Sequence, residues 1–420
     1  MSFPQMIRLR QHFDAPQVAD VPYEVEQQLS VLQMQKKVNV GETVAITVGS
    51  RGIANIPVII KSICNHFKRI KAKPFIVPAM GSHGGGTTDG QLAILKDYGI
   101  TEETMQVPVR ATMQTEIVGK TPQGIPVHID QYACQADHVF ICNRVKPHTA
   151  FVGEIESGLH KMMLIGLGKH TGATLYHRAT VDYSFQEIAE SVSQVVIKKC
   201  GVLGGLAIVE NAYDETGVIA AVAPDDFLSR EKELLVQAES MMPQLPFSQC
   251  DLLIVDRIGK NISGTGLDTT IVGRKYNDRV ATKKDKASCK RIFVRGLTEE
   301  THGNASGIGI VEVTNKRTVD AIDYKKTHIN CLTAGHLTGA AIPMWFHTDE
   351  EAIAAILHCN GLTEPTNAKV IQISDTRHLA EVSVSRVYEN EIETRNDLEI
   401  IAEPTEMNFD SNHNLCSLMS

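Results

Sequence analysis

Short β-branched segments alternate with amphipathic helical segments along the first half of the chain, and this alternation constrains the fold more than any other feature. The run TVAITVG at residues 43–49 ends on a glycine and is typical of a buried strand. The next segment, residues 56–67, places isoleucines and a phenylalanine on one face of a helix. The same patterns predict a helix at residues 185–200 and strands at residues 74–80, 138–143 and 206–211. Such alternation predicts a mainly parallel sheet with helices on both faces.

A second series of strands begins after a polar, proline-containing stretch at residues 241–250, which is typical of a linker. The run DLLIVDRIG at residues 251–259 has the pattern of a strand followed by a loop. This pattern is repeated at residues 291–298, 318–323 and 368–374. We therefore predict an α/β protein of two α/β domains with mainly parallel sheets, residues 1–245 and 250–420.

Composition excludes several classes of protein. The chain has 420 residues, of which 43% are hydrophobic and 21% charged, as in an ordinary globular protein. A formal net charge of -8 argues against a nucleic-acid-binding protein that relies on a basic surface. No apolar run reaches the ~18 residues of a membrane span, and the N-terminal segment lacks the apolar core of a signal peptide. Nine cysteines without a C-x-x-C pair indicate reduced thiols and predict a cytoplasmic protein.

Glycine-rich loops with basic side chains follow two of the predicted strands. Residues 49–52 contain Arg51, whose planar guanidinium suits a phosphate next to the backbone N–H groups of a helix start. Residues 81–86 contain His83, and a histidine among glycines suits proton transfer near neutral pH. An ordinary turn with a surface arginine and a mobile loop with an incidental histidine are the alternatives. Because ligands of parallel sheets bind beyond the carboxyl ends of the strands, both loops are candidate site segments.

Two further segments carry candidate catalytic groups. Residues 143–149 place His148 after a proline, in a loop that an arginine and a lysine make electropositive. Residues 153–170 place Lys161 among apolar residues and glycines, where a desolvated lysine can serve as a covalent attachment point. A surface histidine on a capped turn and a lysine at the rim of a buried helix are the alternatives. His177 is a candidate metal ligand, but no H-E-x-x-H motif or C-x-x-C pair accompanies it to make a conventional zinc site.

In this order along the chain, Arg51, His83, Pro147–His148, Lys161 and His177 resemble the functional residues of the nickel-dependent lactate racemases. These enzymes belong to a larger family of 2-hydroxyacid racemases and epimerases. His83 follows Arg51 by 32 positions, and His177 follows Lys161 by 16 positions. The second spacing is the most specific part of the resemblance.

The resemblance, which covers residues 40–180 best, implies a cofactor. Enzymes of this family use a nickel-pincer nucleotide, a pyridinium mononucleotide whose thio-substituents hold nickel and which is tethered to a lysine as a thioamide. By resemblance, Lys161 would carry the tether, Arg51 would bind the cofactor phosphate and His177 would ligate nickel. The cofactor-binding residues implied in this way are Ser50, Arg51, Gly81, Ser82 and Lys161.

The resemblance also implies an isomerase that inverts the Cα of a 2-hydroxy acid by transient hydride transfer to the cofactor. His83 and His148 would be the two acid/base groups, because stereoinversion requires one on each side of the substrate. Lys260 would bind the substrate carboxylate. The domain of residues 250–420 would close over the cofactor, with the active site in the cleft between the two domains. The implied partners are a small 2-hydroxy acid and the biosynthesis proteins that load the nickel nucleotide, with no nucleic acid and no membrane.

Two other interpretations remain open from the residues themselves: a phosphate-handling or other metal-dependent enzyme on the same scaffold, and a non-catalytic nucleotide- or metal-binding protein. The chain departs from the family at Val48–Ser50, where an aspartate usually precedes the arginine. The interval from His148 to Lys161 is also longer than in the family. The sequence assigns no role to the remaining unusual residues His160, His170, His302 and Trp345.

Overall fold

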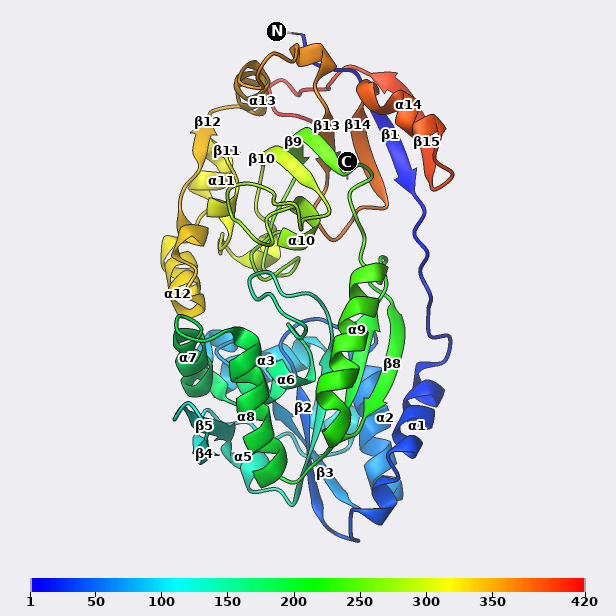
Figure 1. Ribbon diagram of the computed structural model, residues 1–420, viewed down its shortest axis with the longest axis vertical. Helices are drawn as coiled ribbons and strands as arrows, with labels where there is room; N and C mark the ends of the chain where they lie inside the picture. The colour runs from blue at the N-terminus through cyan, green and yellow to red at the C-terminus, as the bar shows by residue number, and fades with distance from the viewer. Residues whose placement is uncertain (1, 419–420) are drawn as a thin grey trace. The chain divides into compact units, whose positions relative to one another are not determined.

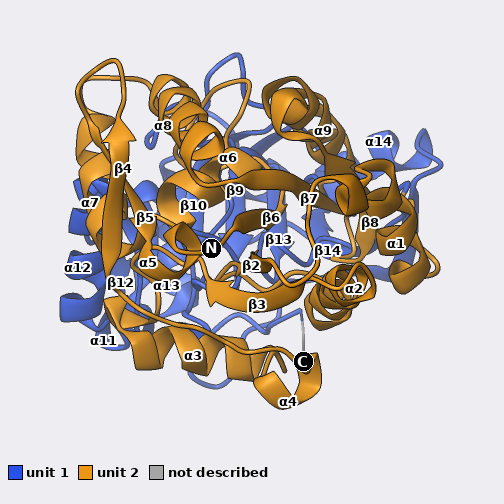
Figure 2. Ribbon diagram, turned by 90° about the horizontal axis from the view of Figure 1, so that it is seen from below, with its two compact units in different colours: residues 1–14, 243–420 blue, residues 15–242 orange. Residues whose placement is uncertain are grey.

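The computed structural model describes residues 2–418 and divides into two compact units. Residues 15–242 form what we call the N-terminal unit, and residues 1–14 together with 243–420 form the C-terminal unit (Figure 2). The division falls beside the proline-containing stretch at the end of the first series of strands. The first 14 residues differ from the predicted domain of residues 1–245, because their strand pairs with strands of the C-terminal unit.

A five-stranded sheet forms the centre of the N-terminal unit (Figure 1). Its strand order is β3-β2-β6-β7-β8; the first four strands are parallel, and β8 is antiparallel to β7. The strands are β2 Thr43–Val48, β3 Lys73–Pro78, β6 His138–Arg144, β7 Val202–Glu210 and β8 Thr216–Val222. A separate antiparallel pair consists of β4 Thr115–Lys120 and β5 Pro126–Asp130.

Two buried apolar clusters lie on the two faces of this sheet, because side chains alternate along each strand. Val44 and Ile46 of β2 belong to a cluster that also contains Ile59 and Ile63 of α2. Ala45, between them in sequence, belongs to the other cluster, which receives side chains from α8 and α9. The helices of this unit are α1 Val21–Val31, α2 Ile56–Arg69, α3 Thr88–Asp97, α4 Glu102–Met105, α5 Gln131–Cys134, α6 Leu159–Lys161, α7 Lys169–Ala179, α8 Phe185–Lys199 and α9 Phe227–Met241.

The C-terminal unit contains an eight-stranded mixed sheet with the order β12-β11-β10-β9-β13-β14-β1-β15. The five strands from β12 to β13 are parallel, and the last three are antiparallel to their neighbours. The strands are β1 Met6–Gln11, β9 Gln249–Val255, β10 Ser288–Val294, β11 Val313–Asn315, β12 Met344–Phe346, β13 Val370–Ile373, β14 Glu381–Ser385 and β15 Leu398–Thr405. The helices are α10 Thr269–Val272, α11 Lys316–Asp320, α12 Tyr324–Ala334, α13 Asp349–His358 and α14 Glu389–Glu393.

One predicted element is wrong. Residues 318–323, expected to continue the strand pattern, lie in and after helix α11. The Asn315 side chain caps this helix by accepting a hydrogen bond from the Thr318 backbone N–H at 2.9 Å, so the chain turns into a helix where β11 ends. Within residues 2–418, no helix is both long and apolar enough to cross a membrane.

Candidate active site

The loops that follow three neighbouring strands of the N-terminal unit carry most of the predicted site residues. β2 leads into Ser50 and Arg51, β3 into residues 81–86, and β6 into residues 145–158. Because β3, β2 and β6 are adjacent and parallel, these loops emerge at the same edge of the sheet. A hydrogen bond between Ser50 Oγ and His83 Nδ1 joins the first two loops.

The loop of residues 81–86 packs closely on the helical segment that follows Lys161. Gly81 adopts a left-handed backbone with φ +57°, and a Cβ there would lie 3.0 Å from Ile165 Cγ2 and 3.1 Å from the Ile165 carbonyl oxygen. The Gly81 N–H donates to the Gly166 carbonyl oxygen at 3.2 Å. A glycine is therefore required at this position, and it anchors the start of the loop that carries Ser82 and His83.

Two guanidinium groups lie near each other beyond β2 and β6. Burial lowers the pKa of Arg51, and the positive charge of Arg144 lowers it further. Arg144 is itself paired with Glu210, and its Nη1 donates to the Gly52 carbonyl oxygen at 3.2 Å. Since a buried guanidinium beside a second cation gains free energy from an added negative charge, this corner of the unit suits an anion such as phosphate.

His148 is held in one ring orientation by the backbone of its own loop. Its Nδ1 accepts hydrogen bonds from the Ala150 and Phe151 N–H groups at 3.1 and 3.0 Å. The His148 N–H donates to Oε2 of the buried Glu156 at 2.7 Å. Because Nδ1 is an acceptor, the proton of the neutral imidazole lies on Nε2.

Phe151 links two of the predicted histidines. Its ring stacks on His148, with centroids 4.2 Å apart, and on His177, with centroids 5.7 Å apart. It also stacks on Phe185 at 4.1 Å, which is the first residue of α8. The loop after β6 and helix α7 are therefore joined at this aromatic stack, and the structure brings His148 and His177 to the same side chain.

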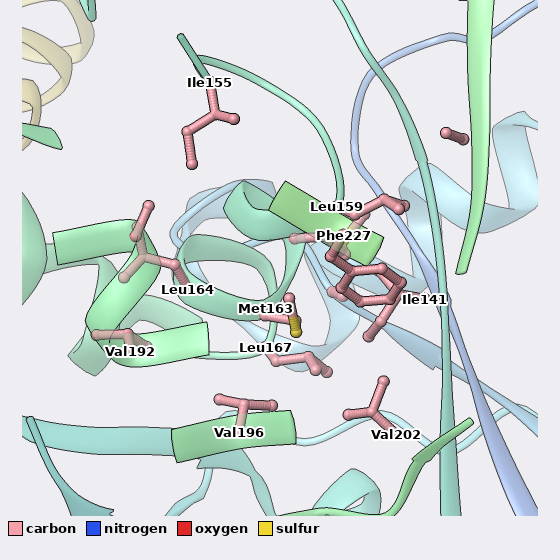
Figure 3. Packing of buried hydrophobic residues seen from close by; sticks show 14 of the residues in the cluster. Ile141, Ile155, Leu159, Met163, Leu164, Leu167, Val192, Val196, Val202 and Phe227 are labelled. Carbon is pink, nitrogen blue, oxygen red and sulfur yellow. The ribbon is translucent and has the colours of Figure 1, made fainter. Parts of the chain in front are cut away.

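The segment that carries Lys161 is fixed by apolar packing on its buried side. Lys161 ends the short helix α6, and a π-helical turn over Met162–Gly166 follows it. Leu159, Met163 and Leu164 pack with Ile141 of β6 and Phe227 of α9 (Figure 3). Lys161 itself is half-buried, and wide helical turns of this kind occur frequently at functional sites.

His177 has an environment that suits a ligand. Among the described residues, its buried Nδ1 has no hydrogen-bond partner. Burial lowers the pKa of His177 to about 4, and the positive charge of Lys161 contributes to the shift. Lys161 and His177 are therefore close enough to interact electrostatically, and the imidazole is neutral near pH 7, the form that binds a metal.

The two extra histidines beside Lys161 have structural contacts. The N–H and Nδ1 of His160 both lie 3.0 Å from Oε2 of Glu231, a carboxylate on α9 that is buried with it. This pair fastens α6 to α9. The ring of His170 lies against Gly86, where a Cβ would be 3.6 Å from the imidazole, so His170 packs on the loop of residues 81–86.

Lys260 lies within the C-terminal unit, in the loop after β9. Its Nζ donates to the Gly264 carbonyl oxygen, and its backbone N–H donates to Thr301 Oγ1 at 3.1 Å. The other two unassigned residues lie at the surface of this unit. His302 is exposed, and Trp345, on edge strand β12, forms an edge contact with His347 at 5.4 Å.

Sequence reasoning missed several groups next to the predicted residues. Phe151 was passed over because nothing local marks an aromatic residue three positions after His148 as its stacking partner. Lys169 was passed over because its motif was considered only as a phosphate loop. In the C-terminal unit, buried Asp375 pairs with Arg257 at 3.1 Å and with His378 Nδ1 at 2.8 Å, beyond the ends of β13 and β9. The only available signal was the position of these charges after strand ends.

Comparison with known proteins bears on the family. Residues 15–188 match the family model described as the lactate racemase N-terminal domain. A search of curated protein sequences finds no significant match. A solved structure, the lactate racemase apoprotein from Thermoanaerobacterium thermosaccharolyticum, is similar with a TM-score of 0.52 and 15% sequence identity. The similarity covers 87% of this chain and 94% of that chain.

These comparisons confirm the resemblance drawn from the order of the loop residues, and they confirm the α/β fold with mainly parallel sheets. At 15% identity, the solved structure supports the fold alone. The family model covers most of the N-terminal unit, including Arg51, His83, His148, Lys161 and His177. The chain therefore carries the N-terminal domain of the lactate racemase family.

Proposed function

We propose that this chain is a racemase or epimerase that inverts the Cα of a small 2-hydroxy acid, with a nickel-pincer nucleotide attached covalently at Lys161. One observation carries the proposal. The side chains that match the family in order also converge in space: Ser50 bonds to His83, and His148 and His177 stack on one phenyl ring. The pKa of His177 further reports that Lys161 is near. A purely structural role would not require this set at one sheet edge.

The residues present fit the cofactor. His177 offers a buried, neutral imidazole whose Nδ1 has no partner among the described residues, as a nickel ligand requires. Arg51 beside Arg144 provides positive charge for the nucleotide phosphate. Lys161 would form the tether, and Ser50, Gly81 and Ser82 would line the site from the neighbouring loops. When bound, the nickel nucleotide supplies an acceptor for hydride.

His83 and His148 would hold and move the proton of the substrate hydroxyl. Ser50 fixes Nδ1 of His83, which directs Nε2 as the atom for proton transfer. His148 carries its proton at Nε2 in the neutral form and is set to donate to a substrate oxygen. Proton uptake by His148 requires it to give up its two backbone contacts, because an imidazolium carries hydrogen on both nitrogens. Catalysis in both directions therefore involves a change in the loop of residues 145–158.

Lys260 remains our proposed contact for the substrate carboxylate. Its ammonium lies in a loop beyond the carboxyl end of a parallel strand, where ligands of such sheets bind. To reach a substrate, Nζ would exchange its contact with the Gly264 carbonyl for a charge-assisted bond to a carboxylate, which is stronger. Together these roles imply a small hydroxy acid as substrate and dedicated proteins that load the cofactor.

The proposal is tested by intact mass and nickel content after co-expression with a cofactor-making pathway. We expect an adduct of the nickel nucleotide on the parent protein and no adduct on Lys161→Ala. Lys198→Ala, at the exposed end of α8, is the matched control and should load like the parent. An unmodified parent, in a host that loads a related racemase, would exclude the cofactor and favour a phosphate-handling enzyme or another metal enzyme.

A further inference from the structure

Lys169 is a fully buried lysine in the N-terminal unit, and no step proposed above uses it. Its side chain is 0% exposed, and Nζ donates to the Pro78 carbonyl oxygen at 2.5 Å and to Gln91 Oε1 at 3.0 Å. Nζ also forms an ion pair with Oδ2 of Asp130 at 3.1 Å, and that carboxylate is equally buried. One ammonium thus contacts the end of β3, helix α3 and the end of β5.

Burial of this pair is costly, and the fold accepts the cost. Burial lowers the pKa of Lys169 and raises the pKa of Asp130, and each partner opposes the shift of the other. Lys169 also has a left-handed backbone with φ 55°, which is uncommon for a residue with a side chain. Strained backbone and buried charge concentrate at functional sites, so a role beyond packing is expected here.

Gln91 extends the network to the loop that carries His83. It is 0% exposed, and its Nε2 donates to the Gly81 carbonyl oxygen at 3.0 Å and to the His83 carbonyl oxygen at 3.4 Å. The amide has one acceptor oxygen, which Lys169 occupies, and its N–H groups are thereby turned toward the loop. The Lys169 ammonium therefore sets the orientation of the group that holds both ends of the Gly81–His83 segment.

The same lysine is the first residue of α7, the helix that carries His177. It lies eight positions after Lys161 and eight before His177. Asp130 contributes a further constraint, since its N–H donates to the Leu167 carbonyl oxygen at 2.7 Å, just after the π-helical turn. The network of Lys169, Gln91 and Asp130 thus connects the loop of His83 to the segment that runs from Lys161 to His177.

We propose that Lys169 is a positioning residue, which acts through Gln91 to hold the loop of residues 81–86 in register with helix α7. The proposal rests on the proposed function for the roles of His83 and His177, but the mechanical link does not. Loss of the ammonium frees the Gln91 amide to rotate, the carbonyl oxygens of Gly81 and His83 lose their donor, and the loop loosens. His83 then spends less time bonded to Ser50 and in the position for proton transfer.

Amide hydrogen exchange in residues 81–87 of the cofactor-free protein tests the link directly. Among these residues, the N–H groups of Gly81, His83, Gly86 and Thr87 are bonded to backbone carbonyls. We expect exchange there to be at least tenfold faster in Lys169→Met and in Gln91→Leu, with unchanged exchange in β6 and β7. Lys198→Met is the control for loss of a lysine and should behave like the parent.

Gln91→Glu provides a second, more discriminating variant. A carboxylate still accepts from Lys169 but has no N–H to donate to the loop, so we expect loop exchange as fast as in Gln91→Leu despite the retained ion pair. Should Lys169→Met fail to fold, the two Gln91 variants decide the question. Unchanged loop exchange in both, or a Lys169→Met protein that is less stable but exchanges like the parent in residues 81–87, would overturn the proposal.

Loaded enzyme separates positioning from simple stabilisation. We expect kcat of Gln91→Leu and Gln91→Glu to fall at least tenfold with KM changed less than twofold, because the substrate contacts remain. A fall in thermal stability with kcat preserved would mean that the network is only structural and would overturn the positioning role. A loosened loop in a parent protein that inverts no hydroxy acid would instead contradict the proposed function while leaving the link intact.

Discussion

The imidazole of His148 stacks on the phenyl ring of Phe151, with the ring centroids 4.2 Å apart and the planes 13° from parallel. The same phenyl ring stacks on His177 and on Phe185. One aromatic side chain therefore connects a proposed acid/base group, a proposed nickel ligand and the start of α8. Its position depends on the loop after β6, which must return to α6 within the sheet edge.

Replacement of Phe151 should impair activity more than stability. In Phe151→Leu, the two imidazoles lose a flat partner worth about 0.5–1.5 kcal/mol per aromatic pair, and His148 gains freedom to rotate. We expect kcat of the loaded enzyme to fall roughly tenfold or more, as steady-state kinetics would show. Phe227→Leu, in the same apolar cluster but on α9, is the control for the loss of a buried ring. Equal losses of kcat in the two variants would argue against a special role for Phe151.

Acid should destabilise the cofactor-free protein through His177. Its pKa is about 4 in the folded protein against a usual value of 6.5, so the unfolded chain binds more protons between these values. Folding stability therefore falls as pH decreases from 6.5 to 4, by at most about 3 kcal/mol from this residue. In His177→Asn, urea unfolding measured across this pH range should show a shallower fall. Parallel curves for the parent and the variant would show that His177 is not buried in the neutral form.

The pair of His160 and Glu231 should prove structural. Glu231→Ala leaves the backbone N–H and Nδ1 of His160 without their acceptor inside the protein, which we expect to cost about 2–4 kcal/mol of unfolding free energy. Glu231→Gln keeps an acceptor oxygen and should cost less than half as much. Urea denaturation measures both. If the two variants were equally stable, the contacts between α6 and α9 would not depend on this carboxylate.

Thiol reactivity should single out one cysteine. Cys359 is exposed, whereas burial raises the pKa of Cys64, Cys142 and Cys200 to about 12. Iodoacetamide at pH 8 should label Cys359 first, because alkylation requires an accessible thiolate. Peptide mapping locates the label, and Cys359→Ser should abolish the fast phase. Fast labelling of any of the three buried thiols in the folded protein would contradict the packing described for the N-terminal unit.

Much of the fold was predictable because its strands are continuous β-branched runs. The predicted strands at residues 43–49, 74–80, 138–143 and 206–211 are confirmed by β2, β3, β6 and β7. The place of β1 was not predictable. Its Ile7 and Leu9 are fully buried between β14 and β15, more than 370 residues away, and no local pattern records such a distant pairing.

The site was predictable as a set of loops but not as a set of contacts. Arg51, His83 and His148 follow strands that are recognisable from their residues, so the edge of the sheet could be inferred. The stack on Phe151 and the burial of Lys169 arise only when segments distant in sequence meet. A lysine in the run GLGKH gives no sign that its ammonium is enclosed by a carbonyl, an amide and a carboxylate.

Stereochemical inversion is the most direct test of the account. Loaded protein should be incubated with single enantiomers of 2-hydroxy acids of increasing size, and the product enantiomer followed by chiral chromatography. We predict that one acid at least is racemised or epimerised, and that His83→Gln and His148→Gln each retain the adduct at Lys161 but lose turnover by a factor of about 10² or more. Full turnover in either variant, or a correctly loaded parent that inverts none of the acids, would contradict the account.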